Sequence, residues 1–455
     1  MSTYSIINPY DETVLDELTY TSESEAMAAL EGVREGLASA RRRTAHERAS
    51  VLKKLTELLR RDAEIIAQQI TAEIGKTITD SRVEVQRAAA TFECAAEEAR
   101  RNNGETLDSD AYGGQRGKWG LTTYQPIGVV LAITPFNFPI NLPAHKIGPA
   151  FAAGNTILFK PGPQNYLSAR LLTQLCHEAG MTQADIALIC PDVPVMEKLI
   201  AHPDIACISF TGGTQTAKAI AKNAGLKKLL FELGGNDPLI VMPDADLELA
   251  ATTTINQRFQ TAGQRCTACK RLFIHAEVYE RFRDILVSKT ATLKVGDPTR
   301  DDTVVGPVVS ARAATEVEER IQQAKEQGAT VLSGGSRKGN VIEPTIIEDV
   351  PDACLLIADE TFGPVAPLLK FDSVDDLVRR ANGTEFGLQS GVFTRDLGVV
   401  KQLFERLDVG AMAVNDGPGF RAEHFPFGGV KHSGLGREGV RYAMREMSHI
   451  KTLIL

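Results

Sequence analysis

The chain has 455 residues, 43% of them hydrophobic and 24% charged, with a formal net charge of −8 at pH 7. This length is too great for one compact core, so two or three domains are expected. The negative charge argues against nucleic acid as a partner, and no apolar run reaches the roughly 18 residues of a membrane helix. The start lacks the charged and apolar regions of a signal peptide, and seven scattered cysteines are typical of the reducing cytoplasm.

The N-terminal part is expected to be mainly helical, over residues 23–101. The apolar residues that recur there with helical spacing include Leu52, Leu55, Leu58 and Leu59. Glycines within 113–117 interrupt this pattern, and polar and apolar residues then alternate as far as Gln125.

Strands and helices alternate along most of the remaining chain. Between residues 129 and 233 the expected strands are 129–134, 156–160, 205–211 and 229–233, and the expected helices are 144–153, 166–179 and 214–224. A second series has expected helices at 279–293 and 311–327 and expected strands at 368–371, 390–393 and 410–415. This rhythm predicts an α/β protein in which helices cover both faces of parallel sheets.

Two glycine-rich turns could bind phosphate. The literal G-x-G-x-x-G from Gly434 to Gly439 follows no buried strand, and only 16 residues come after it, so we interpret it as a turn before the last helix. The segment Thr211, Gly212 and Gly213 joins a predicted strand to a helix start, where free backbone N–H groups suit a phosphate. An ordinary tight turn is the alternative for this second segment.

Four punctuated segments carry the candidate chemistry. Asn137 lies in Pro-Phe-Asn-Phe-Pro, Glu232 in Phe-Glu-Leu-Gly-Gly, Cys266 in Gly-Gln-Arg-Cys-Thr and Glu360 in Glu-Thr-Phe-Gly-Pro. A thiol, a carboxylate base and an amide donor together can carry covalent catalysis at a carbonyl. Cys266 and Cys269 form a lone C-x-x-C, so no metal site is expected, while a redox pair stays open.

The order and spacing of these segments resemble the aldehyde dehydrogenase superfamily, from Ile7 to Leu455. The resemblance implies an aldehyde dehydrogenase-like fold with a Rossmann-type nucleotide-binding domain (1–105 and 127–233), an α/β catalytic domain (234–433) and a small oligomerisation sheet (106–126 and 434–455). It also implies a homodimer or homotetramer.

The resemblance assigns roles to single residues. Cys266 is the expected nucleophile, Glu232 the base that activates water, and Asn137 an oxyanion donor together with the Cys266 N–H. The residues expected to bind NAD or NADP are Lys160, Thr211, Gly212, Gly213, Glu360 and Phe362. Pro163 stands where relatives often have a ribose-binding glutamate, so we expect NADP to be tolerated.

Four basic residues match pocket positions of relatives that oxidise phosphate-, phosphonate- or sulfonate-bearing aldehydes: Arg87, His145, Arg265 and Arg421. They predict a small anionic aldehyde such as phosphonoacetaldehyde, sulfolactaldehyde or glyceraldehyde 3-phosphate, because arginine suits a bidentate anion. Three of them have a plainer alternative. Arg87 points away from its helix's apolar stripe and could be solvated, His145 could be a packed or surface histidine, and Arg265 could form a structural salt bridge.

Three other functions remain open. The substrate could be a neutral hydroxyaldehyde such as lactaldehyde. The enzyme could be a CoA-acylating semialdehyde dehydrogenase, although Glu232 favours release of the free acid. A catalytically silent structural protein on the same fold is the alternative outside enzymes.

Overall fold

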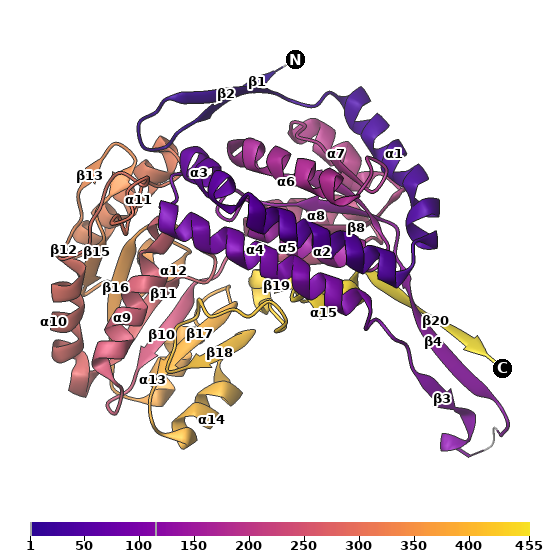
Figure 1. Cartoon of the computed structure of the whole chain (residues 1–455). Helices are drawn as coiled ribbons and strands as arrows, with labels where there is room; N and C mark the ends of the chain where they lie inside the picture. The colour runs from indigo at the N-terminus through magenta and orange to yellow at the C-terminus, as the bar shows by residue number, and fades with distance from the viewer. Residues whose placement is uncertain (1, 114–115) are drawn as a thin grey trace.

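The computed structural model describes residues 2–113 and 116–455, and three sheets organise it (Figure 1). Two large sheets with helical layers form the body, and a small sheet extends from it as an arm. The predicted α/β class is confirmed. The glycine-rich break at 113–117 falls partly on residues 114–115, which lie outside the described residues.

The first large sheet has six strands. Their order is β19 (Gly434–Leu435), β9 (Lys228–Glu232), β8 (Ile205–Thr211), β5 (Val129–Ile133), β6 (Thr156–Lys160) and β7 (Ile186–Leu188). All neighbours are parallel except the antiparallel β19–β9 pair. Alternate residues of β5 enter different cores, because Val130 and Ala132 face one helical layer and Leu131 faces the other.

Helices cover both faces of this sheet. One layer contains α2 (Ala45–Arg61), α3 (Ala63–Ile74), α4 (Ile78–Ala99), α5 (Asn141–Ala152), α6 (Tyr166–Ala179) and α15 (Val440–Glu446). The other contains α1 (Glu23–Arg42), α7 (Val193–Ala201) and α8 (Thr214–Ala224). Every residue of α5 is buried, as expected for a helix enclosed on all sides.

The second large sheet has seven strands. Their order is β12 (Thr330–Ser333), β15 (Thr345–Glu348), β16 (Val365–Phe371), β11 (Cys269–His275), β10 (Asp237–Val241), β17 (Gln389–Phe393) and β18 (Ala411–Val414). Only β12–β15 is antiparallel. The helices of this part of the chain are α9 (Leu247–Arg258), α10 (Tyr279–Thr290), α11 (Ala311–Glu326), α12 (Leu355–Ala358), α13 (Val374–Asn382) and α14 (Leu397–Arg406).

Small antiparallel elements complete the fold. The arm consists of β3 (Thr106–Asp108), β4 (Trp119–Pro126) and β20 (Ser448–Ile454). Two hairpins are β1 (Thr3–Ile7) with β2 (Val14–Thr19), and β13 (Arg337–Lys338) with β14 (Val341–Ile342). In the described part of the chain, no helix combines the length and the apolar character needed to cross a membrane.

The sequence pattern located most elements and missed others. The helical stretch 23–101 is divided into four helices, and Gly75 ends α3 in the left-handed conformation with φ +70°. The strands β7 and β10–β12 were not expected. The G-x-G-x-x-G segment precedes the last helix, but its first two residues form β19, so residues 434–447 pack with the six-stranded sheet. The division into domains therefore stays a proposal.

Close packing of α1 against the loop before β7 predicts opposite effects for two alanine substitutions. A Cβ on Gly36 would lie 2.0 Å from the Ala184 carbonyl oxygen, whereas a Cβ on Gly32 meets no atom within 4 Å. Gly32→Ala should stabilise the helix by about 0.5–1 kcal/mol. Gly36→Ala should destabilise the protein by about 1–3 kcal/mol, because the helix must shift. Thermal melting of both variants tests this, and equal melting temperatures would contradict it.

Candidate active site

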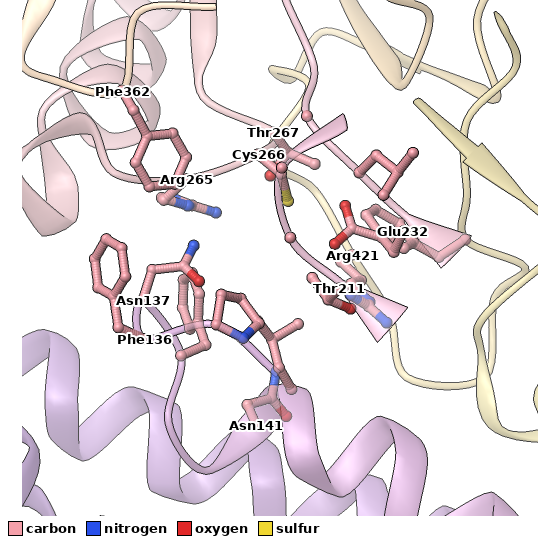
Figure 2. Close-up of a pocket in the computed structure, with 18 of the residues that line it drawn as sticks. Phe136, Asn137, Asn141, Thr211, Glu232, Arg265, Cys266, Thr267, Phe362 and Arg421 are labelled. Atoms are coloured by element: carbon pink, nitrogen blue, oxygen red, sulfur yellow. The ribbon is translucent and has the colours of Figure 1, made fainter. Parts of the chain in front are cut away.

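A cavity of about 260 Å³ lies where loops from the two large sheets meet (Figure 2). The segments that follow β5, β8 and β9 reach it from the six-stranded sheet. The loops before β11 and before β16, and the segment around Gly419, reach it from the seven-stranded part. Ligand sites of open parallel sheets lie at the carboxyl ends of the strands, and this cavity lies at the carboxyl ends of β5, β8 and β9 in the six-stranded sheet.

Cys266 reaches the cavity on a strained loop. Thr261, Ala262 and Gly263 have left-handed φ values of 54°, 52° and 72°, which is costly for the two residues with side chains. A Cβ on Gly263 would lie 2.3 Å from the Gly363 carbonyl oxygen, so this loop packs directly on the loop that follows Phe362. Figure 2 shows the thiol between Asn137 and Glu232.

Glu232 ends β9 with its carboxyl group turned toward the thiol (Figure 2). Its side chain is buried, and neither oxygen has a hydrogen-bond partner within the described residues. Burial, with the nearby Glu438 charge as the next cause, raises the pKa of Glu232 to about 8. Burial and Glu232 in turn raise the pKa of Cys266 well above the usual thiol value, and the Lys270 ammonium opposes them.

Asn137 keeps part of its amide free. One N–H of the buried side chain donates to the Gln264 carbonyl at 2.9 Å, which links the loop after β5 to the cysteine loop. A carboxamide nitrogen has two N–H groups, so the second can serve a ligand in the cavity. The Asn137 loop is anchored to α4, because the Glu84 carboxylate accepts hydrogen bonds from the Ile140 and Asn141 N–H groups at 2.9 and 3.1 Å.

The predicted cofactor residues have polar groups that no other protein group binds within the described residues, and these groups suit a dinucleotide. Thr211 and Gly213 lead into α8, whose N-terminus has no side-chain cap, and the buried Thr211 hydroxyl lacks a partner among the described residues. Such an N-terminus favours phosphate. The ammonium of Lys160, at the end of β6, has no carboxylate within ion-pair distance in the described structure. These residues therefore fit a nicotinamide dinucleotide.

Glu360 and Phe362 line the other side of the cavity. One oxygen of Glu360 lies 3.1 Å from the Lys270 ammonium and accepts from the Gly235 N–H at 3.3 Å. The Phe362 ring meets the Phe136 ring edge-on with 6.2 Å between centroids. Both side chains thus line the same cavity as the Cys266 thiol.

Three of the four predicted substrate residues line the cavity: Arg87, Arg265 and Arg421. Arg87 donates to Glu423 at 2.9 Å, so it is not a solvated surface residue. Arg421 donates to Glu438 at 2.9 Å and stacks on Phe427, with 3.9 Å to the ring centroid. Arg265 has no carboxylate partner in residues 2–113 and 116–455, and donates only to the Gln260 amide and the Gly419 carbonyl.

His145 and Cys269 lie outside this lining. His145 is fully buried in α5, with Nε2 at 2.9 Å from Glu423, and burial lowers its pKa, so it reaches the arginines only through that carboxylate. Cys269 is buried in β11, and burial raises its pKa to about 12. All seven cysteines are free thiols, and the described residues contain no cluster placed to hold a metal ion.

Sequence reasoning missed four charged residues near the site: Lys146, Lys270, Glu423 and Glu438. Lys146 pairs with Glu438 at 2.9 Å in the interior. Lys146 in the mainly apolar segment that forms α5 was an available signal because buried charges need partners, whereas Lys270 stands beside Arg271 at the start of β11 and gave no such signal. No pattern marked Glu423 or Glu438, since their partners are far away in the sequence.

A model of the aldehyde dehydrogenase family matches residues 1–453. The chain is 56% identical over 454 residues to the sulfoacetaldehyde dehydrogenase of Neptuniibacter caesariensis, covering all of both proteins. It is 36% identical to the 3-sulfolactaldehyde dehydrogenase of Priestia megaterium, covering 99% of this chain and 94% of that one.

Among solved structures, the chain resembles the NADP-dependent glyceraldehyde-3-phosphate dehydrogenase from Bacillus halodurans in complex with NADP. The TM-score is 0.97 at 36% identity, with 100% of this chain and 96% of that chain covered. With the fold, the cavity and the full-length matches in agreement, this chain belongs to the aldehyde dehydrogenase family.

Proposed function

We propose that the protein oxidises a small sulfonate-bearing aldehyde, of the sulfoacetaldehyde type, to the free acid with NAD or NADP. The observation that carries the substrate class is the Arg265 guanidinium, which lines the cavity beside Cys266 with no carboxylate partner in the described structure. A largely buried guanidinium without a carboxylate at ion-pair distance is costly, and the nearby Asp80 charge offsets only part of that cost in the described structure. An anionic substrate group within reach supplies a counter-ion, and a charged hydrogen bond is stronger than the two neutral ones it replaces.

The sulfonate is proposed to lie among the three arginines. Arg87 and Arg421 each hold a carboxylate in the structure, so they extend the positive region without adding a full uncompensated charge. The similarity to dehydrogenases named for sulfonated aldehydes supports a sulfonate over a phosphonate or phosphate. Glu423 holds Arg87 in place and borders His145.

The chemistry is proposed to proceed through the Cys266 sulfur. The thiolate attacks the aldehyde carbon, and the free Asn137 N–H and the Cys266 N–H stabilise the resulting oxyanion. Bound NAD or NADP supplies the hydride acceptor. Loss of hydride from carbon leaves a thioester on Cys266. Glu232 then takes a proton from water, the hydroxide adds to the thioester, and the acid leaves as the thiolate re-forms.

The assembly and location belong to the same proposal. The arm exposes large apolar side chains, which supports a homo-oligomer: Trp119, Leu121, Ile450, Leu453 and Ile454. Free thiols at all seven cysteines support a cytoplasmic location.

Substitution of Arg265 should separate anionic from neutral substrates. Arg265→Met should raise KM for sulfoacetaldehyde about 10- to 100-fold, because a charge-assisted hydrogen bond contributes about 1.5–3 kcal/mol. KM for propanal should change much less. Arg265→Lys keeps the charge but loses the planar guanidinium, so its KM for sulfoacetaldehyde should lie between those of the wild type and Arg265→Met. Initial rates with both aldehydes and with lactaldehyde, each with and without CoA, provide the measurement.

Equal effects of Arg265→Met on sulfoacetaldehyde and propanal would contradict the anionic substrate. A wild-type preference for lactaldehyde would favour the neutral hydroxyaldehyde. Dependence of turnover on CoA would favour the acylating reaction.

The raised pKa of Glu232 predicts a rate that increases with pH. Only the ionised carboxylate accepts a proton from water, so thioester hydrolysis should slow as pH falls below about 8. Glu232→Gln should cut steady-state turnover by about 100-fold or more but keep a stoichiometric burst of reduced cofactor. Stopped-flow absorbance at several pH values measures both phases. Cys266→Ser is the control without a burst, and full turnover in Glu232→Gln would exclude this carboxylate as the base.

Pro163 predicts that NADP is accepted. Pro163 begins a short helical turn after β6, so a carboxylate there would repel a 2′-phosphate held beside Lys160. Pro163→Glu should lower kcat/KM for NADP about tenfold or more with little change for NAD. Pro163→Gln is the neutral control. Equal effects of the two variants, or a wild-type preference for NAD beyond about a thousandfold, would contradict this prediction.

A further inference from the structure

Lys270 lies on β11 beneath the loop that carries Cys266, and its side chain is fully buried. The ammonium donates to the Arg265 carbonyl at 2.8 Å and to the Cys266 carbonyl at 2.6 Å, and it lies 3.1 Å from a Glu360 oxygen. A buried ammonium is costly unless several acceptors surround it. These three acceptors belong to loops that line the cavity, so the Lys270 charge acts on the site.

The hydrogen bond from Lys270 to the Arg265 carbonyl fixes the direction of the Cys266 N–H. The Arg265–Cys266 peptide is planar and trans, so its carbonyl and its N–H point in opposite directions. Lys270 and the Ala268 N–H, at 3.2 Å, hold the carbonyl on the buried side. Within residues 2–113 and 116–455 the Cys266 N–H donates to no protein acceptor, which leaves it free for a ligand.

Several charges surround the thiol. Glu232 reaches it from β9, Glu360 from the loop before Phe362, Arg265 from its own loop and Lys270 from β11. Asp237 of β10 also interacts electrostatically with Lys270. Burial and Glu232 raise the pKa of the thiol, and Lys270 counteracts them. Because Glu360 lies against Lys270, its negative charge offsets part of that effect.

We propose that Lys270 is a positioning residue for this reaction. It turns the Arg265–Cys266 peptide so that the N–H faces the substrate carbonyl, and its charge favours the Cys266 thiolate, with Glu360 setting how much of that charge the thiol experiences. The inference rests on the proposed role of Cys266 as nucleophile, and it adds a residue that no sequence motif identified.

Alkylation of Cys266 in the enzyme without cofactor tests this directly. Iodoacetamide reacts with the thiolate, so the pH dependence of the rate reports the thiolate fraction, and mass spectrometry of the Cys266 peptide identifies the site. Lys270→Met has nearly the same length without the charge. Its midpoint should rise by at least about one pH unit, which corresponds to about tenfold slower alkylation at neutral pH. Lys270→Arg restores a positive charge and should return the midpoint toward that of the wild type.

Glu360→Gln should shift the alkylation midpoint in the direction opposite to Lys270→Met. Removal of this carboxylate leaves the Lys270 charge uncompensated, so the midpoint should fall and alkylation should accelerate. A merely structural role of Lys270 predicts no such pair of opposite shifts. Lys270→Met should also lower kcat more than it changes KM for the cofactor, because the N–H acts mainly on the oxyanion.

The proposal is overturned if the midpoint is unchanged in Lys270→Met, or if Glu360→Gln shifts it upward. Circular dichroism melting identifies a variant that does not fold, and in that case the downward shift expected for Glu360→Gln still decides the matter. Full activity in Cys266→Ser would instead refute the proposed function. The alkylation experiment needs no aldehyde, so the two failures are distinguishable.

Discussion

Removal of water from the cavity between the two large sheets is the constraint on which the site depends. Loops that follow strands of the six-stranded sheet and loops that precede strands of the seven-stranded sheet enclose Cys266 and Glu232, and burial is the largest cause of the raised pKa of each. The same burial that holds a thiol and a carboxyl largely neutral makes every remaining charge act strongly over short distances. The neighbouring charges therefore determine which of the two groups ionises at a given pH.

The surrounding buried ions follow from that constraint. Lys146 meets Glu438, Lys76 meets Glu84, and Lys270 meets Glu360, so each of these three interior lysines is paired with a carboxylate. Replacement of such pairs by apolar residues often costs no stability, and their value here is positional. Glu84 holds the Asn137 loop through two backbone N–H groups, and Lys270 holds the Cys266 loop through two carbonyls.

The sequence predicted what depends on local spacing. Short apolar runs and glycine placement located β5, β6, β8 and β9, and the four motif segments converge on one cavity. It missed β10 and β11, because Pro238 in β10 and the charged pair Lys270 and Arg271 in β11 interrupt their apolar runs. Helical periodicity alone left Arg87 open as a solvated residue, and in the structure a carboxylate from residue 423, 336 positions later, holds it at the cavity. Pairings of such separation leave no mark on a single sequence.

The three arginines that line the cavity differ in whether a carboxylate is bound to them. Arg87 and Arg421 each contact a carboxylate, whereas Arg265 bonds only neutral oxygens, although each of the three keeps one buried nitrogen without a partner within the described residues. In a site of low dielectric constant, an uncompensated charge contributes more to selectivity than paired ones, because a neutral substrate leaves it unpaired. A monoanionic sulfonate balances one such charge. The proposed selectivity thus rests on the Arg265 guanidinium next to the nucleophile. Arg87 and Arg421, which are paired with carboxylates, border the proposed position of the sulfonate.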